Sequence, residues 1–333
     1  MLFLGIETSC DETGASVIAT ETVNNRTTST ILSNIVSSQY IHSQYGGVIP
    51  ELASRAHIQL IVPITKTALE VAKINYQDLD GIAVTYAPGL VGALLVGLSF
   101  SKALSLSLGK PFIGVNHLEG HIFSLFLSYP NLEPPFLALV ISGGHTELLL
   151  IKGRCEYEAL GSTVDDACGE AFDKVARMLG LPYPGGAFIE KIAQAGKRNI
   201  NFPIPHIPGY NFSFSGLKTA VLYYLKAEKN PVIADIACSF QEVVCDFLLK
   251  KIQLASDNYK ITCIGVSGGV AINNRIQERF AQYGKKQNLQ FYFPKPSMCT
   301  DNAAMIAAAG TERYTRFGPS PLTLTAEARV KII

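Results

Sequence analysis

The sequence has almost no net charge, no closely spaced cysteine pair and no apolar leader, and each absence argues against a class of protein. Its 28 lysines and arginines stand against 27 aspartates and glutamates, which leaves a formal charge of +1. A chain so balanced has no global basic field that would draw it to nucleic acid. Any contact with RNA must therefore come from a local patch or be shared with a partner.

The seven cysteines are scattered along the chain without a C-x-x-C pair, which predicts reduced thiols as in a cytosol. Glu7, Asp11 and Glu12 interrupt the apolar start, so we expect no secretory signal. The stretch 89–108 has Lys102 as its only charge and is long enough to cross a membrane. Its many Gly, Ser and Ala residues instead favour a buried helix packed on a sheet. We expect a cytoplasmic protein without a membrane segment.

A length of 333 residues exceeds one ordinary hydrophobic core and predicts two domains. The chain is 48% hydrophobic and contains 28 glycines, which is typical of a globular α/β protein. Residues 129–135, with three prolines, are the best candidate linker. We therefore expect an N-terminal domain over 1–130 and a C-terminal domain over 131–310, with 311–333 packing back on the first.

The order of the expected elements repeats in the two halves of the chain. Each half has a hairpin with a polar tip, followed by a strand, a glycine turn and a helix. The expected strands lie at 2–6, 14–19, 81–86, 112–115, 136–141, 147–151 and 261–266. Residues 24–30 form a variable polar stretch to which no element is assigned. Such an internal repeat usually means two similar domains facing a cleft.

Two histidines, His117 and His121, are four residues apart in a predicted helix. Side chains at this spacing share one face, so both imidazoles can reach one metal ion. A pair of structural histidines is the ordinary alternative. A third ligand could be Asp301, which opens a run of small residues, although an aspartate there is usually a helix cap. The pattern is not that of a zinc peptidase, because Leu118 stands where H-E-x-x-H needs glutamate.

Two Gly-Gly turns, Gly143-Gly144 and Gly268-Gly269, each follow an expected strand. Glycine lets the main chain approach an anion closely, and a following helix presents unpaired N–H groups to phosphate. Neither turn matches the P-loop or the Rossmann fingerprint. Their equivalent places in the two repeats nevertheless predict a nucleotide held between domains.

Two further stretches are ambiguous. Asp166, Glu170 and Asp173 share a helical face, which by default is simply solvated. Residues 211–219 (Asn-Phe-Ser-Phe-Ser-Gly-Leu-Lys-Thr) mix aromatic, hydroxyl and basic side chains. That composition could stack on RNA bases, but core packing explains it equally well.

Several motifs, in order along nearly the whole chain, resemble one family within the actin/Hsp70/sugar-kinase superfamily. The family is that of the tRNA adenosine threonylcarbamoyltransferases (TsaD in bacteria), formerly called O-sialoglycoprotein endopeptidases. The form of the first motif is similar to the bacterial and mitochondrial branch. The motifs are Gly5-Ile-Glu-Thr-Ser-Cys-Asp-Glu-Thr13, Asn116-His-Leu-Glu-Gly-His121, Val140-Ile-Ser-Gly-Gly-His-Thr146, Gly169-Glu-Ala-Phe-Asp-Lys174, Tyr183-Pro-Gly-Gly186, Gly268-Gly-Val-Ala-Ile-Asn273 and Cys299-Thr-Asp-Asn302.

The resemblance implies two similar actin-like domains and specific roles for named residues. His117, His121 and Asp301 would bind one divalent metal ion, with Fe²⁺ favoured over Zn²⁺. Asp11 or Glu12 would lie near the reacting carbonyl and accept a proton. The residues implied to bind threonylcarbamoyl-AMP are Val140, Ile141, Ser142, Gly143, Gly144, Asp173, Gly186, Glu190 and Asn273.

The resemblance also implies a reaction and partners. The exocyclic amine of adenosine 37 in tRNAs that read codons beginning with A would attack the carbamoyl carbon, and AMP would leave. A paralogous actin-like subunit (TsaB-type) and a small ATPase (TsaE-type) would be partners. Three alternatives remain: a kinase or ATPase of the same superfamily, a non-catalytic scaffold paralogue, and a two-His-one-carboxylate iron oxygenase, whose usual β-sandwich barrel the α/β pattern does not offer.

Overall fold

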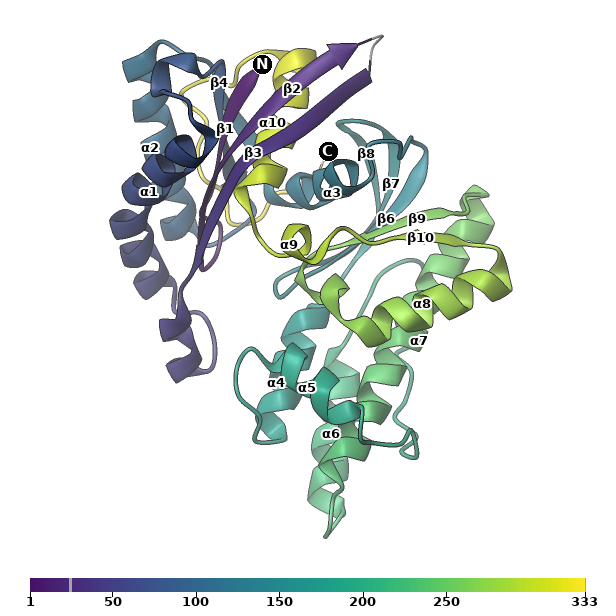
Figure 1. Cartoon of the computed structure of the whole chain (residues 1–333). Helices are drawn as coiled ribbons and strands as arrows, with labels where there is room; N and C mark the ends of the chain where they lie inside the picture. Colours follow the sequence, from purple (N-terminus) through teal and green to yellow (C-terminus); the bar gives the residue numbers. More distant parts are fainter. Residues whose placement is uncertain (24–25, 333) are drawn as a thin grey trace. The chain divides into compact units, whose positions relative to one another are not determined.

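The computed structural model describes residues 1–23 and 26–332, and the chain divides into two compact units (Figure 1). Unit 1 contains Met1–Leu132 and Pro294–Ile333, and unit 2 contains Glu133–Phe293. We expected the second domain to continue to residue 310. Residues 294–310 instead belong to unit 1, because the helix that they enter packs on the sheet of that unit.

Unit 1 is built on a five-stranded mixed sheet with the strand order β3-β2-β1-β4-β5. Strands β1, β2 and β3 are antiparallel neighbours, whereas β4 and β5 continue from β1 in parallel. The strands are β1 (Leu2–Glu7), β2 (Glu12–Val23), β3 (Arg26–Ser38), β4 (Gly81–Ala87) and β5 (Phe112–Asn116). The helices are α1 (Pro50–Ala72), α2 (Val91–Leu108), α3 (His117–Ser128), α9 (Pro296–Cys299) and α10 (Ala303–Phe317), with short 3₁₀ turns at Tyr40–Tyr45 and Tyr76–Asp78.

Unit 2 repeats this topology, with the strand order β10-β9-β6-β7-β8. Strands β6, β7 and β8 are antiparallel, and β9 and β10 continue from β6 in parallel. The strands are β6 (Phe136–Ile141), β7 (Thr146–Gly153), β8 (Glu156–Ser162), β9 (Cys263–Ser267) and β10 (Gln290–Tyr292). The helices are α4 (Cys168–Met178), α5 (Gly185–Ala193), α6 (Ser215–Ala227), α7 (Ile233–Tyr259) and α8 (Asn274–Gln287), with a 3₁₀ turn at Gly269–Ile272. The expected duplication is therefore confirmed strand by strand.

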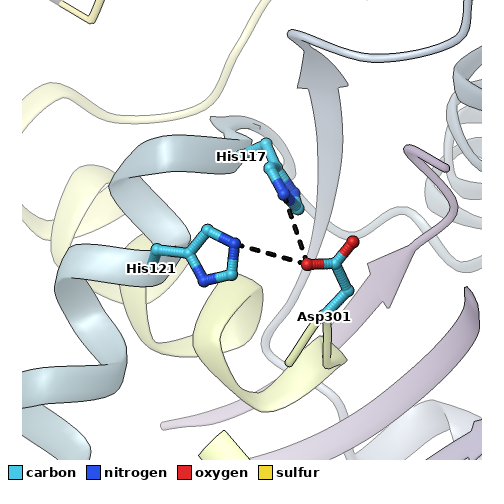
Figure 2. Close-up of side chains that lie close together, drawn as sticks. All are labelled: His117, His121 and Asp301. Carbon is cyan, nitrogen blue, oxygen red and sulfur yellow. Dashed lines mark ion pairs between the residues drawn. The ribbon is translucent and has the colours of Figure 1, made fainter. Parts of the chain in front are cut away.

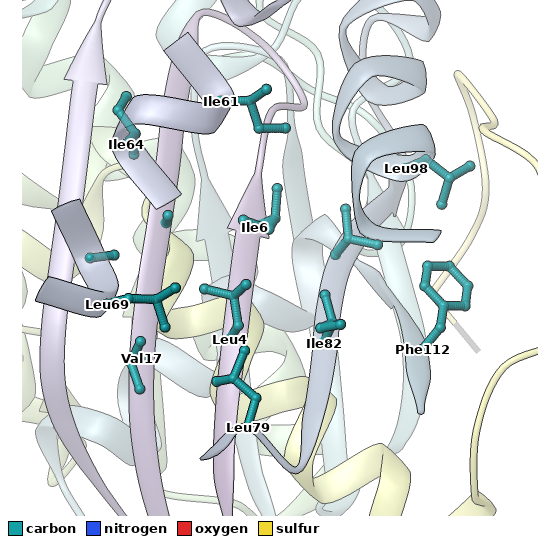
Figure 3. Close-up of a cluster of buried hydrophobic side chains, with 13 residues drawn as sticks. Leu4, Ile6, Val17, Ile61, Ile64, Leu69, Leu79, Ile82, Leu98 and Phe112 are labelled. Carbon is teal, nitrogen blue, oxygen red and sulfur yellow. The ribbon is translucent and has the colours of Figure 1, made fainter. Parts of the chain in front are cut away.

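The two faces of the first sheet receive different helices because side chains alternate along a strand. Leu4 and Ile6 of β1 join the cluster under α1, where Ile61 and Leu69 pack against the sheet (Figure 3). Gly5 points the other way, where a β-carbon would lie 2.2 Å from the carbonyl oxygen of Ala303. The small residues of β1 and α10 thus allow this helix to lie directly on the sheet.

The sequence analysis missed one strand of unit 1 and was wrong about the burial of one helix. No element was assigned to the polar stretch 24–30, but β3 begins at Arg26 and pairs with β2. Asn24 and Asn25 of that stretch lie outside the described residues. The sequence 89–108 was expected to be a buried helix, yet only a third of α2 is buried. Among the described residues α2 is the one helix long and apolar enough to cross a membrane, and its inner face packs on β4 and α1.

The aromatic residues of stretch 211–219 form part of the core of unit 2. Phe212 and Phe214 are fully buried, and their rings lie 5.9 Å and 5.5 Å from that of Phe247 in α7. Edge-to-face contacts of this kind are typical of a packed interior. The core-packing alternative is therefore confirmed for these two rings.

Candidate metal centre and nucleotide loops

Three side chains from distant parts of unit 1 converge on one point (Figure 2). His117 begins α3 and His121 lies one turn further on, so the backbone of a single helix sets their spacing. One carboxylate oxygen of Asp301 lies 3.4 Å from Nε2 of His117 and 3.3 Å from Nε2 of His121. The structure therefore brings together the three residues that the sequence suggested as a cluster.

Asp301 is available as a ligand because its neighbour performs the capping. The side chain of Asn302 accepts a hydrogen bond from the backbone N–H of Met305 and thereby caps α10. An N-cap needs only one such acceptor. The carboxylate of Asp301, one residue earlier, is consequently directed to the histidines and not to the helix end.

Two observations show that the cluster fits a metal ion: the distances between its ligand atoms, and buried ring nitrogens that lack hydrogen-bond partners within the described part of the chain. Two ligand atoms that are each about 2.1 Å from an ion lie about 3.0–3.4 Å apart at octahedral to tetrahedral angles, which the two His–Asp distances match. His121 is fully buried, and both its ring nitrogens lack a hydrogen-bond partner among the described residues. A buried polar atom without a partner is costly, and an ion would satisfy Nε2. This group could hold a metal ion.

The charges of the metal-free cluster compensate one another. Burial lowers the pKa of His117, but the carboxylates of Asp301 and Glu7 outweigh it and hold that pKa well above its usual range. Burial raises the pKa of Asp301, but the two histidines hold it well below its usual range. The pKa of His121 is lowered, with burial as the largest cause. The site thus presents one ionised carboxylate and one neutral imidazole before any ion binds.

Asp11 lies in the turn between β1 and β2, and Glu12 is the first residue of β2; both are partly buried. Burial raises the pKa of Glu12 to about 9, and the charges of Asp301 and Asp11 add to this effect. Thr8 anchors the start of the turn, since its hydroxyl donates to the carbonyl oxygen of Ala93 in α2 at 2.9 Å. The carboxyl group of Glu12 therefore carries a proton at neutral pH in the metal-free protein.

In unit 2 the two Gly-Gly turns follow the carboxyl ends of two neighbouring parallel strands. They lie at the same end of the sheet, because Val140 of β6 pairs with Ser267 of β9. At Gly268, with φ +93°, a β-carbon would lie 2.3 Å from the carbonyl oxygen of Ile141. Only glycine fits there. The expectation that the turns are counterparts in two domains was wrong, since both belong to unit 2.

The remaining predicted substrate residues of unit 2 form two local pairs. Asp173 accepts the backbone N–H of Gly185 at 2.7 Å, which places it beside Gly186. Glu190 accepts the backbone N–H of Asn274 at 2.9 Å, which places it beside Asn273. Val140 and Ile141 have fully buried side chains, so only their backbone could face a ligand. Ser142 accepts the backbone N–H of His145 through its hydroxyl at 3.1 Å and so shapes the turn before Gly143 and Gly144.

The side chain of Asn273 makes two hydrogen bonds within the protein. Its side-chain oxygen caps α8 by accepting the N–H of Ile276, and its side-chain amide donates to Gln241 of α7 at 2.9 Å. The second donor of that amide is the group it could offer a ligand. Gln241 gave no signal in the sequence, because it lies within an ordinary helical stretch.

Asp166 was expected to lie on a solvated face, and this was wrong. It precedes α4, is 9% exposed, and binds Lys174 at 2.7 Å and Lys218 at 2.6 Å. Burial raises the pKa of Asp166, but the hydrogen bonds from the two lysines outweigh it and the net pKa is lowered. This residue ties the loop before α4 to α6.

Sequence reasoning also missed the residues that surround the cluster in unit 1. Glu7 and Ser9 contact Nδ1 of His117, each at 3.1 Å, and Thr85 contacts Glu7. Glu7 was assigned to the polar turn, but it is the last residue of β1 and fully buried. A carboxylate at the end of an apolar strand, followed by hydroxyl residues, was the available signal.

The chain therefore consists of two α/β units of the same topology, and unit 1 carries a His-His-Asp group that could hold a metal ion. Full-length HypF, solved with phosphate and nucleotide bound, aligns with a TM-score of 0.64 at 15% identity, over 96% of this chain and 56% of that chain. Component A of the (R)-2-hydroxyglutaryl-CoA dehydratase of Acidaminococcus fermentans aligns with a TM-score of 0.56 at 12% identity, over 95% and 99%. At these identities the likeness concerns the fold alone.

The chain belongs to the family of tRNA N6-adenosine threonylcarbamoyltransferases (TsaD), which matches residues 30–308. The enzyme of that name from Thermosipho africanus is 50% identical over 100% of both chains. Those from Dictyoglomus turgidum and Clostridium kluyveri are 51% and 49% identical, over 98% and 99% of this chain and 97% of each relative.

Proposed function

We propose that the protein transfers the threonylcarbamoyl group from threonylcarbamoyl-AMP to the exocyclic amine of adenosine 37 in tRNAs that read codons beginning with A. The observation that carries this proposal is the similarity to transferases of that name, at about half identity over the full length. The amine nitrogen forms a bond to the carbamoyl carbon, the bond from that carbon to the phosphate oxygen breaks, and AMP leaves. The amine loses one proton in the process.

An arylamine is a poor nucleophile, so the carbonyl must be polarised. A divalent ion on His117, His121 and Asp301 would supply a Lewis acid or an orienting charge. The ligand set of two imidazoles and one carboxylate suits Fe²⁺ and also Zn²⁺, and we favour Fe²⁺. The kinase and scaffold alternatives have no use for this group.

The proton acceptor that we propose is Asp11. Glu12 keeps its proton at neutral pH chiefly because it is buried, and an ion on Asp301 would not remove that cause. A protonated carboxyl group can donate a hydrogen bond but cannot accept the amine proton. Asp11→Asn should therefore lower the transfer rate more than Glu12→Gln, while both retain AMP binding.

For unit 2 we propose that the Gly143-Gly144 and Gly268-Gly269 turns hold the phosphate of the adenylate by close backbone approach. Asp173 would accept the ribose hydroxyls beside Gly186. Glu190 and Asn273 complete the proposed set, with backbone contacts from Val140, Ile141 and Ser142. The position of the two turns at the same end of the sheet and the two local pairs described above support this assignment.

We further propose that transfer of the threonylcarbamoyl group to tRNA takes place in the cytoplasm and needs two partners, a TsaB-type actin-like subunit and a TsaE-type ATPase. The formal charge of +1 leaves little excess of basic residues for a phosphate-binding surface. Helices α1 and α2 also expose apolar side chains, among them Ile58, Val62 and Leu106, at 62%, 56% and 67%. Exposed apolar side chains of this kind are suited to an interface with a partner protein.

The test is a reconstituted transfer assay with threonylcarbamoyl-AMP and unmodified tRNA, read by mass spectrometry of the tRNA nucleosides. Modified adenosine should form only with this protein present, and multiple turnovers should require the two partners. ATP hydrolysis without modified adenosine would contradict the transferase proposal. Full turnover by this chain alone, little affected by salt, would contradict the need for partners.

A further inference from the structure

Glu7 is a buried carboxylate behind the candidate metal ligands. It has 0% exposure and lies in unit 1 at the end of β1. Its Oε1 atom accepts the backbone N–H of Ser9 at 2.5 Å. Its Oε2 atom accepts the hydroxyl of Thr85 at 2.7 Å and lies 3.1 Å from Nδ1 of His117. Two strands and one helix therefore meet at a single carboxylate.

The contact with Glu7 determines which nitrogen of His117 keeps its proton when an ion binds. An ionised carboxylate only accepts hydrogen bonds, so Nδ1 of His117 must be the donor at 3.1 Å. The other nitrogen, Nε2, faces Asp301, so it is the nitrogen that gives up its proton and offers a lone pair when an ion binds. A nearby hydroxyl, Ser9 Oγ, is also 3.1 Å from Nδ1 and could donate to it in the opposite tautomer. The charge of Glu7 excludes that tautomer, because two lone pairs would face each other.

The second histidine has no comparable support. Nδ1 of His121 lacks a hydrogen-bond partner among the described residues, so no protein group there fixes its tautomer. The two ligands are therefore unequal: His117 is preset for binding through Nε2, whereas His121 must adopt the right tautomer when an ion arrives. Partners that orient a metal-binding histidine in this way typically raise metal affinity 10- to 100-fold.

We infer that Glu7 is a positioning residue that holds His117 as the Nδ1–H tautomer, so that Nε2 is presented to the metal ion. This inference rests on the proposed metal centre. Glutamine in its place would keep the size of the side chain but offer an NH₂ group in place of one oxygen. Turned toward His117, that group could donate to Nδ1 and stabilise the tautomer whose Nε2–H blocks the ion. Turned toward the N–H of Ser9, it would place two donors against each other.

The experiment measures Zn²⁺ affinity of the full chain by competition with a chromophoric chelator, after removal of bound metal. Glu7→Gln should weaken Zn²⁺ binding by about 10- to 100-fold. The matched control is Glu119→Gln, which removes another fully buried carboxylate, one that lies on α3 between the two histidines and pairs with Arg313 at 3.2 Å. That variant should lose stability but keep its Zn²⁺ affinity within about threefold, since an ordinary loss of stability leaves the ligands in place.

A second measurement needs no variant of Glu7. In the Zn²⁺-loaded wild type with ¹⁵N-labelled histidine, the chemical shifts should show His117 with a proton on Nδ1 and metal on Nε2. A wild-type protein that binds Zn²⁺ with His117 in the opposite tautomer would overturn the inference. Equal Zn²⁺ affinity in wild type and Glu7→Gln would overturn it as well. Zn²⁺ binding that is unchanged in His117→Ala would instead overturn the metal centre itself, so the two failures are distinguishable.

Discussion

His57 and Thr13 are joined by a buried hydrogen bond of 2.8 Å between Nδ1 and the hydroxyl oxygen. The other ring nitrogen of His57, Nε2, lies 3.0 Å from the carbonyl oxygen of Cys10. A carbonyl oxygen only accepts, so Nε2 carries the proton and Nδ1 accepts from Thr13. His57 of α1 thereby contacts the chain on both sides of Asp11 and Glu12, at Cys10 in the turn and at Thr13 in β2.

His57→Ala should therefore loosen this turn without touching the metal ligands. The loss of these two hydrogen bonds and of the side-chain volume should cost about 2–4 kcal/mol of unfolding free energy. We also expect the transfer rate to fall about tenfold through misplacement of the carboxyl groups. Urea unfolding and the transfer assay measure the two effects. A normal rate with unchanged metal content would show that these contacts are irrelevant to catalysis.

Removal of a principal ligand should empty the metal centre. Purified His117→Ala should contain about one equivalent of metal less than the wild type. His206, an exposed histidine of unit 2, provides the control, and His206→Ala should retain the wild-type content. Inductively coupled plasma mass spectrometry gives both values. Equal metal content in wild type and His117→Ala would rule out the triad.

The nucleotide proposal can be tested where added bulk meets no protein atom. A β-carbon at Gly269 would have nothing within 4 Å, so Gly269→Val should leave the fold intact. If the turn faces the adenylate phosphate, calorimetric affinity for AMP should fall at least about tenfold, because a side chain blocks close approach. Gly216 has the same open surroundings on α6, and Gly216→Val should bind AMP normally. Unchanged affinity in both variants would place the nucleotide elsewhere.

The stabilising effect of Asp166 should depend on pH in a defined direction. Its pKa is lowered in the folded protein, so its contribution is fully present above the ordinary value of 3.8 and is lost as pH falls through the folded value. At pH 7, Asp166→Asn should cost about 1–2 kcal/mol, a figure reduced for screening because the Lys174 side chain is 39% exposed.

Urea unfolding of wild type and Asp166→Asn at neutral and acidic pH measures this difference directly. The difference in unfolding free energy between the two proteins should become smaller as pH falls below 3.8. Asp257→Asn, at an exposed carboxylate of α7, should show no such gap at either pH. A gap that stays constant down to the lowest accessible pH would mean that the two lysines do not stabilise the folded state through this carboxylate.

Local sequence patterns sufficed where the determining interactions are close along the chain. The i, i+4 spacing of His117 and His121 depends only on helix geometry, and the apolar strand β1 and the Gly-Gly turns depend on neighbouring residues. The duplication was visible because each half repeats such local units in order. The same reasoning missed β3. Its polar residues do not indicate a strand by themselves, and the strand is stabilised by its pairing with β2.

Tertiary structure decided which side chains become partners across long separations. Only the fold shows that Asn302 caps α10 and thereby leaves Asp301 to the histidines. It also buries Glu7 against His117, 110 residues away, and returns the segment from Pro294 onward to unit 1. The physical reason is that a buried carboxylate must find its donors wherever the packed chain places them, and no periodicity in the sequence records that choice.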